Sequence, residues 1–108
     1  MAWVLLIVAG LLETCFAVAL KLSDGFSRPL PTALFALSAV GSFALLALAL
    51  RGLPVGTAYA VWTGIGAAGT VAVGMAVLHE PVTPGRLAAI GLIVAGVIGL
   101  NLAGAAHQ

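Results

Sequence analysis

A single carboxylate lies near the middle of the first apolar segment of this 108-residue chain. The stretch "GLLETCFAVALK" (10–21) carries Glu13 within a run, 2–20, that otherwise contains no charged residue. In a helix rising ~1.5 Å per residue, Glu13 would lie about 3 Å from the centre of that run. Ionisable residues at such depth are expensive, and they usually line a pathway or a proton relay. Because removal from water favours the neutral acid, this group can exchange a proton near neutral pH, and it can equally hold a cation.

Helical spacing places small side chains and one aromatic ring beside this carboxylate. Ala9, Gly10, Phe16 and Ala17 share a face with Glu13. Small residues allow either close helix packing or a cavity, and the sequence leaves both open. A purely structural alternative for Glu13 is a protonated side chain that hydrogen-bonds to a neighbouring helix.

The third apolar segment is the richest in polar and aromatic residues. Its stretch "GTAYAVWTGIGAAGTV" (56–71) places four of them and one glycine on one helical stripe: Tyr59, Trp62, Thr63, Gly66 and Thr70. Two aromatic rings inside the membrane could stack on a cation or hydrogen-bond a carboxylate. Gly64 and Gly66 follow directly, and the sequence predicts either a hinge or close packing there.

The composition requires a membrane environment for these residues. Hydrophobic residues make up 63% of the chain and charged residues only 6%, whereas soluble domains have about a quarter charged residues. The charges divide the chain into four runs, about 2–20, 31–50, 56–78 and 86–104, each close to the ~20 residues that a helix needs to cross hydrocarbon. Since lipid offers no partner to backbone groups, we predict an all-α membrane protein with one four-helix transmembrane domain, residues 1–108.

The remaining residues offer no enzymatic chemistry. No metal-ligand spacing, nucleophile–base pair or phosphate-binding loop is apparent, and a net charge of +1 makes no basic patch for nucleic acid. In the second run, Ser38 and Ser42 lie at i and i+4, a spacing at which serines often bond their own helix. We therefore predict no enzyme, no cofactor, no metal and no nucleic-acid partner.

The basic residues give only a weak orientation signal. Lys21, Arg28 and Arg86 lie in the first and third loops, and Arg51 with the terminal amine lies on the other side. Because the two sides carry nearly equal numbers of positive charges, the chain can insert in both orientations. A chain that inserts both ways can pair antiparallel with itself. The fourth run has many small residues at helical spacing, a pattern typical of an oligomerisation helix.

Taken together, these features resemble the small multidrug resistance family of proton-coupled exporters over essentially the whole chain. "LPVGTAYAVWTGIGA" (53–67) and "LKLSDGFSRPLP" (20–31) carry the likeness, and the first looks most like the guanidinium exporter subtype. The resemblance implies an antiparallel, dual-topology homodimer in the bacterial inner membrane. It implies proton-coupled export of guanidinium or small substituted cations, with protons and substrate competing for Glu13.

The resemblance also implies roles for individual residues. Tyr59, Trp62 and Ser42 match the substrate site of the family, and part of the dimer contact falls on Ala89, Leu92, Ile93 and Gly96. Phe16 stands where the subtype usually has tryptophan, which keeps a face for a cation but loses the indole N–H donor. Alternatives are a broader exporter of hydrophobic cations, a non-transporting membrane subunit, or an ATPase rotor proteolipid, whose two-span hairpin fits four runs poorly.

Overall fold

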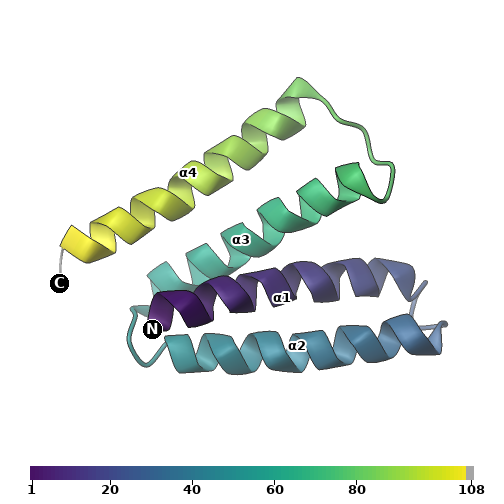
Figure 1. The fold of residues 1–108 in the computed structure, drawn as a ribbon, viewed down its shortest axis with the longest axis horizontal. Coiled ribbons are helices and arrows are strands. Elements are labelled where there is room, and N and C mark those ends of the chain that lie inside the picture. The colour runs from purple at the N-terminus through teal and green to yellow at the C-terminus, as the bar shows by residue number, and fades with distance from the viewer. Residues whose placement is uncertain (107–108) are drawn as a thin grey trace.

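The computed structural model describes residues 1–106, which form four helices joined by short loops (Figure 1). The helices are α1 (Ala2–Leu22), α2 (Pro29–Ala49), α3 (Val55–Ala76) and α4 (Pro84–Ala106). All four are long and apolar enough to cross a membrane, so the predicted all-helical fold is confirmed. Positions 107 and 108 of the predicted domain lie outside the described residues.

Prolines and local hydrogen bonds determine where the helices begin. Pro29 and Pro84 occupy the first positions of α2 and α4, where a missing N–H removes no helical hydrogen bond. For this reason α2 and α4 start two residues before the runs predicted from charge alone, 31–50 and 86–104. The Oγ1 atom of Thr83 accepts a hydrogen bond from the Arg86 N–H at 3.1 Å, which caps the first turn of α4.

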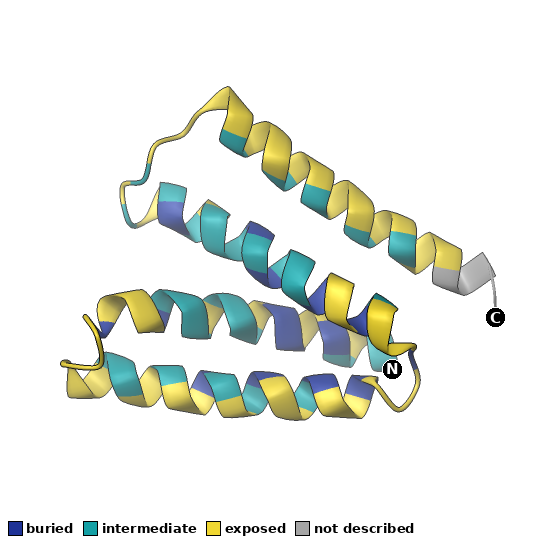
Figure 2. Cartoon of the chain, turned by 180° about the vertical axis from the view of Figure 1, so that it is seen from behind, coloured by how far each residue is buried: buried dark blue, intermediate teal, exposed yellow. Residues whose placement is uncertain are grey.

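Helix α1 lies between α2 and α3, and α4 packs chiefly against α3 (Figure 1). Consecutive helices run antiparallel, so the N-terminus, the α2–α3 loop and the end of α4 lie at one end of the molecule (Figure 1). Most residues of α4 are exposed, in contrast to the inner faces of α1 and α3 (Figure 2). Helix α4 therefore lies at the edge of the bundle, in contact with α3, and leaves its own outer face uncovered.

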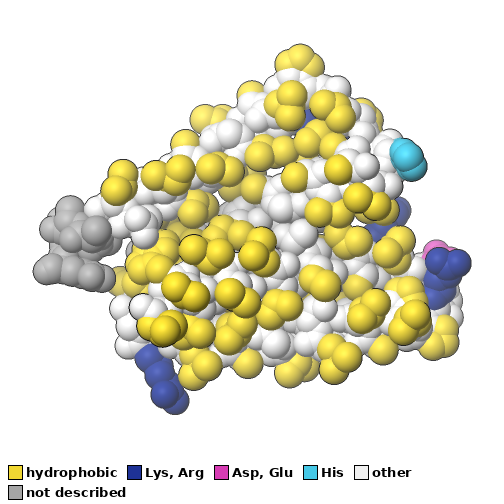
Figure 3. Space-filling view, in the orientation of Figure 1, with side chains coloured by type: hydrophobic (Ala, Val, Ile, Leu, Met, Phe, Trp, Pro, Cys, Tyr) yellow, Lys and Arg dark blue, Asp and Glu magenta, His cyan; other side chains and the backbone are white. Residues whose placement is uncertain are grey.

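The buried core lies at the end of the bundle that holds the N-terminus. It consists of side chains from the first half of α1, the second half of α2, the loop after α2 and the first half of α3: Leu6, Ala9, Leu46, Ala49, Leu53, Ala58, Val61 and Trp62. Outside it, apolar side chains cover the visible face, and charged side chains gather toward the ends of the helices (Figure 3). This distribution is the one expected where lipid replaces water around the middle of the bundle.

Gly10 allows the close approach of α1 and α3 in this core. A Cβ atom at position 10 would lie 2.7 Å from both Cβ and Cγ2 of Ile65. Neither atom is the far end of a flexible side chain, so the two helices would have to separate.

We expect Gly10→Ala to lower the free energy of unfolding by about 1–3 kcal/mol, because it overpacks a tight interface. Titration with sodium dodecyl sulfate, followed by circular dichroism, measures the change. Gly56→Ala is the matched control, since a Cβ at Gly56 meets no atom within 4 Å. If the free energy of unfolding falls equally in the two variants, Gly10 does not have the proposed packing role.

Candidate functional site

Glu13 lies near the middle of α1, with its carboxylate directed at α3. Gly66 of α3 makes room for it, because a Cβ atom at position 66 would overlap the Oε1, Cδ and Cγ atoms of Glu13. The Oε1 atom is buried and has no hydrogen-bond partner among the described residues. An uncommitted carboxylate oxygen at this depth is available to a proton or a cation.

Two threonine hydroxyls hold the α3 backbone beside this carboxylate, and one of them comes from α1. Thr14, the next residue along α1, donates a hydrogen bond to the Gly66 carbonyl at 3.2 Å. Thr70 donates to the same carbonyl from within α3 at 2.6 Å. The backbone that faces Glu13 is thus held by two hydroxyls, and neither is spent on the carboxylate.

A chain of buried hydrogen bonds joins the three inner helices one turn before Glu13. The indole N–H of Trp62 donates to Ser42 Oγ at 2.9 Å, and the Ser42 hydroxyl donates to the Ala9 carbonyl at 2.6 Å. Ser42 is fully buried and Trp62 is 5% exposed. The indole donor is therefore engaged with Ser42, and the aromatic ring is what Trp62 offers to a ligand.

Ser42 and Ser38 behave differently despite their regular spacing. The Ser38 hydroxyl donates to the Leu34 carbonyl of its own helix at 2.6 Å and lies 3.2 Å from Cys15 Sγ of α1. The Ser42 hydroxyl instead donates to a backbone carbonyl of α1 and accepts from the Trp62 indole. Spacing alone could not separate the two roles, because both serines face α1 and differ only in the groups that they meet there.

Aromatic rings form a continuous row that includes Phe16, one turn after Glu13, with neighbouring centroids 5.2–6.1 Å apart. In order along the row the rings are Phe26, Phe35, Phe16, Phe43, Trp62 and Tyr59. Phe16 stacks on Phe43, which contacts Trp62 in turn. Tyr59 ends the row and is 58% exposed, so its hydroxyl and ring face are accessible.

The two candidate hinge glycines contact different helices. Gly64 lies against Val97 and Ile93 of α4, whereas Gly66 lies against Glu13 of α1. Helix α3 is uninterrupted through both positions. Close packing accounts for both glycines in this conformation, and a hinge there stays a prediction.

The candidate dimer residues of α4 occupy the border of a groove beside α3. Ile93 is half-buried against α3, whereas Ala89, Leu92 and Gly96 are exposed. Leu92, Ile93 and Gly96 line a groove of about 610 Å³, which Tyr59 and Thr63 line from α3. Three of the four residues therefore remain available for contacts outside the chain.

Sequence reasoning did not assign site roles to several residues that the structure brings to the site. Thr14 bonds across to α3, Phe43 links Phe16 to Trp62, and Thr63 Oγ1 is buried without a partner among the described residues. Thr63 lies on the predicted stripe with Tyr59 and within the stretch 53–67 that carries the family resemblance, and these were the signals for it. No group of three His, Cys, Asp or Glu side chains that could hold a metal occurs within residues 1–106.

Four helices long and apolar enough to cross a membrane define a multi-pass membrane protein, whose first helix carries a carboxylate with a buried, unpartnered oxygen among the described residues. The chain matches the model of the family described as Small Multidrug Resistance protein over residues 1–93. A relative named "Guanidinium exporter" from Escherichia coli is 53% identical over 102 residues, which cover 94% of this chain and 97% of the relative. Another of that name from Yersinia pseudotuberculosis is 52% identical over 103 residues, which cover 95% and 99%. The chain belongs to the small multidrug resistance family of transporters, which confirms the predicted resemblance.

The Trp62–Ser42–Ala9 chain of hydrogen bonds leads to a stability prediction. Ser42→Ala should lower the free energy of unfolding by about 1–3 kcal/mol, because it leaves a buried indole N–H without an acceptor. The same substitution in a Trp62→Phe background should cost less, since the donor is already gone. A double-mutant cycle measured by denaturant titration gives the coupling, which we expect to be on the order of 1 kcal/mol.

Ser38→Ala is the matched control for Ser42→Ala, because the Ser38 hydroxyl donates within its own helix and its partner on α1 is the weakly bonding Cys15 sulfur. Its loss of stability should be the smaller one. If the losses of stability in Ser42→Ala and Trp62→Phe simply add in the double variant, the two side chains are not energetically coupled and the prediction is wrong.

Proposed function

We propose that this protein exports guanidinium or small substituted guanidinium cations across the bacterial inner membrane in exchange for protons. The observation that carries the proposal is the buried, unpartnered Oε1 atom of Glu13 in a membrane helix. The relatives named guanidinium exporters, about half identical to this chain, support the choice of cation. As a secondary active transporter, the protein would need no cofactor.

The chemistry of guanidinium suits the Glu13 carboxylate. The planar cation presents parallel N–H donors to both oxygens of a carboxylate, a geometry that a quaternary ammonium cannot reproduce. Rings beside the carboxylate can stack on the flat face of the cation. Phe16 and Tyr59 are the more accessible rings, since Trp62 is only 5% exposed.

Competition for Glu13 couples the two movements. A protonated Glu13 is neutral and loses its attraction for a cation. An ionised Glu13 binds a cation, whose positive charge neutralises the carboxylate. If the protein switches between its inward-open and outward-open states only when Glu13 is occupied, outward movement of the cation is coupled to inward movement of protons. Substrate affinity should therefore fall as the pH falls.

The working unit in this proposal is an antiparallel, dual-topology homodimer with a Glu13 from each subunit at its centre. Near balance of Lys and Arg between the two sides permits both orientations in the membrane. The exposed residues Ala89, Leu92 and Gly96, with Ile93, would supply part of the contact between subunits. Gly64 and Gly66 would supply the flexibility that alternating access needs.

A second candidate is a broader exporter of hydrophobic cations at the same site. Phe16 favours it, because its ring packs in an apolar row with Phe35 and Phe43 and has no N–H donor with which to orient Glu13. Such a site would depend more on apolar contact and less on hydrogen bonds to the cation.

Glu13→Gln should abolish proton-driven guanidinium transport in proteoliposomes, because the amide can neither ionise nor release a proton. Solid-supported-membrane currents measure the transport. Glu80→Gln is the matched control, since Glu80 lies in the α3–α4 loop and pairs with Arg86 at 3.0 Å. Undiminished currents in Glu13→Gln, or equal loss in the control, would defeat the proposal.

Phe16→Trp should shift selectivity toward guanidinium. The added indole N–H can donate to Glu13 and orient it, and one neutral hydrogen bond is worth about 0.5–1.5 kcal/mol, or roughly a 2- to 10-fold change in relative affinity. Currents for guanidinium and for tetrapropylammonium, measured on both proteins, give the ratio. A ratio that does not change, or moves toward the ammonium, would show that Phe16 does not set selectivity.

A further inference from the structure

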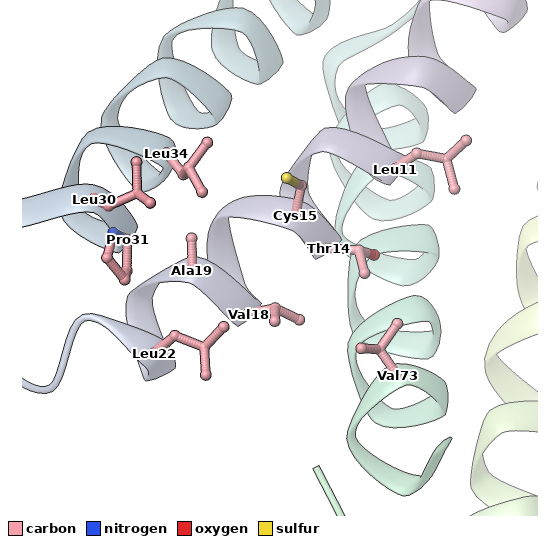
Figure 4. Close-up of a pocket in the computed structure, with 10 residues that line it drawn as sticks. All are labelled: Leu11, Thr14, Cys15, Val18, Ala19, Leu22, Leu30, Pro31, Leu34 and Val73. Carbon is pink, nitrogen blue, oxygen red and sulfur yellow. The ribbon is translucent and has the colours of Figure 1, made fainter. Parts of the chain in front are cut away.

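A second groove lies along the C-terminal half of α1 (Figure 4). It has a volume of about 400 Å³ and runs along α1 between α2 and α3. The lining residues of α1 recur at helical spacing and are joined by α2 side chains at one end: Leu11, Cys15, Val18, Leu22, Leu30 and Leu34. Leu11 and Glu13 are two residues apart, about 200° around the helix, so this groove and the carboxylate lie on opposite sides of α1.

The lining of this groove offers nothing to a polar ligand. Only Thr14 and Cys15 contribute side-chain heteroatoms, since the other lining residues are apolar. The Thr14 hydroxyl is engaged with the Gly66 carbonyl, and Cys15 Sγ lies 3.2 Å from Ser38 Oγ. A flexible hydrocarbon chain is the ligand that such a lining fits.

The length of the groove matches one leaflet of the membrane. From Leu11 to Leu22, α1 rises about 16 Å at ~1.5 Å per residue, roughly half of the ~30 Å hydrocarbon core. Leu11 lies near the middle of α1, and Leu22 is its last residue. The groove therefore extends from the membrane surface to about the midplane, as one acyl chain of a phospholipid does.

Two basic residues lie along the chain next to the residues that line the surface end of the groove. Lys21 precedes the lining residue Leu22, and Arg28 is the N-cap of α2, two residues before the lining residue Leu30. Both side chains are exposed. Among residues 1–106 the ion pair is formed elsewhere, by Arg86 and Glu80 at the α3–α4 loop, so Lys21 and Arg28 keep their positive charges free for a ligand. Asp24 in the loop between them offsets one charge, which leaves a net positive end.

We propose that this groove binds one anionic phospholipid, with an acyl chain along α1 and the phosphate group near Lys21 and Arg28. The apolar lining, the one-leaflet depth and the positive end are independent features, and each one fits a different part of the same molecule. Because the groove lies on the far side of α1 from Glu13, the lipid would be bound whether or not the protein transports guanidinium.

Native mass spectrometry of the purified full-length protein tests the site. The protein is released from mixed micelles that contain equal amounts of palmitoyl-oleoyl phosphatidylglycerol and phosphatidylcholine. We expect the phosphatidylglycerol adduct to dominate in the wild type. Lys21→Gln with Arg28→Gln should lower its excess by roughly fivefold for each charge removed.

Matched variants separate the groove from general effects of charge and bulk. Arg51→Gln removes a cation from the opposite end of the helices and should leave the adduct unchanged. Lys21→Arg with Arg28→Lys keeps the charges and should retain it. Cys15→Phe fills the groove and should reduce adducts of both lipids, whereas Val4→Phe adds a ring at another exposed position of α1 and should not.

Four results would overturn the proposal. Equal retention of the two lipids by the wild type would remove the role of charge. An equal loss in Arg51→Gln would make the effect nonspecific, and full retention in Cys15→Phe would place the lipid elsewhere. Competition by soluble glycerol phosphate would show that the loop binds phosphate without the acyl chain.

Discussion

The contact between Glu13 and Gly66 is the constraint on which the rest of the bundle depends. A carboxyl group in the middle of a membrane helix cannot face hydrocarbon without a large penalty, so it has to lie against protein. Only a residue without a side chain at position 66 leaves room for it. Gly10, placed against Ile65 one turn earlier, keeps α1 and α3 close enough for this shelter to exist. The glycines of this chain therefore determine a distance between helices as much as they determine any flexibility.

The hydrogen bonds around Glu13 leave its carboxylate free. Trp62 is satisfied by Ser42, Ser42 by the Ala9 carbonyl, and Thr14 by the Gly66 carbonyl. Each of these three donors has an acceptor other than Glu13. An engaged donor is fixed in place, since releasing it would leave a buried polar group unsatisfied. The neighbouring side chains are thus held in place, and the Glu13 carboxylate stays free to bind a proton or a cation.

The helices and Glu13 could be predicted from the sequence because both follow from local properties. Apolar length and the need to satisfy backbone groups determine the spans, and a lone carboxylate in such a span is conspicuous. The partner of Ser42, the cross-helix bond of Thr14 and the contact of Phe43 with Phe16 could not be predicted. They depend on how each helix is rotated about its axis, and small residues occur on so many faces of these helices that periodicity does not determine the rotation. The same reason left Gly64 and Gly66 ambiguous, although the two face different helices.

The described chain by itself leaves polar atoms that lipid cannot satisfy. Glu13 Oε1 and Thr63 Oγ1 are buried and lack partners among residues 1–106. Hydrocarbon offers neither donors nor acceptors, so these atoms carry a desolvation cost until something other than lipid reaches them. Thr63 lines the groove beside α4, whose outer face is exposed and whose Gly91, Gly96 and Gly99 have open space where a side chain would be. A face of small residues next to an unsatisfied hydroxyl suits the close approach of another helix, whereas the carboxylate, sheltered behind Gly66, suits a small cation or a proton.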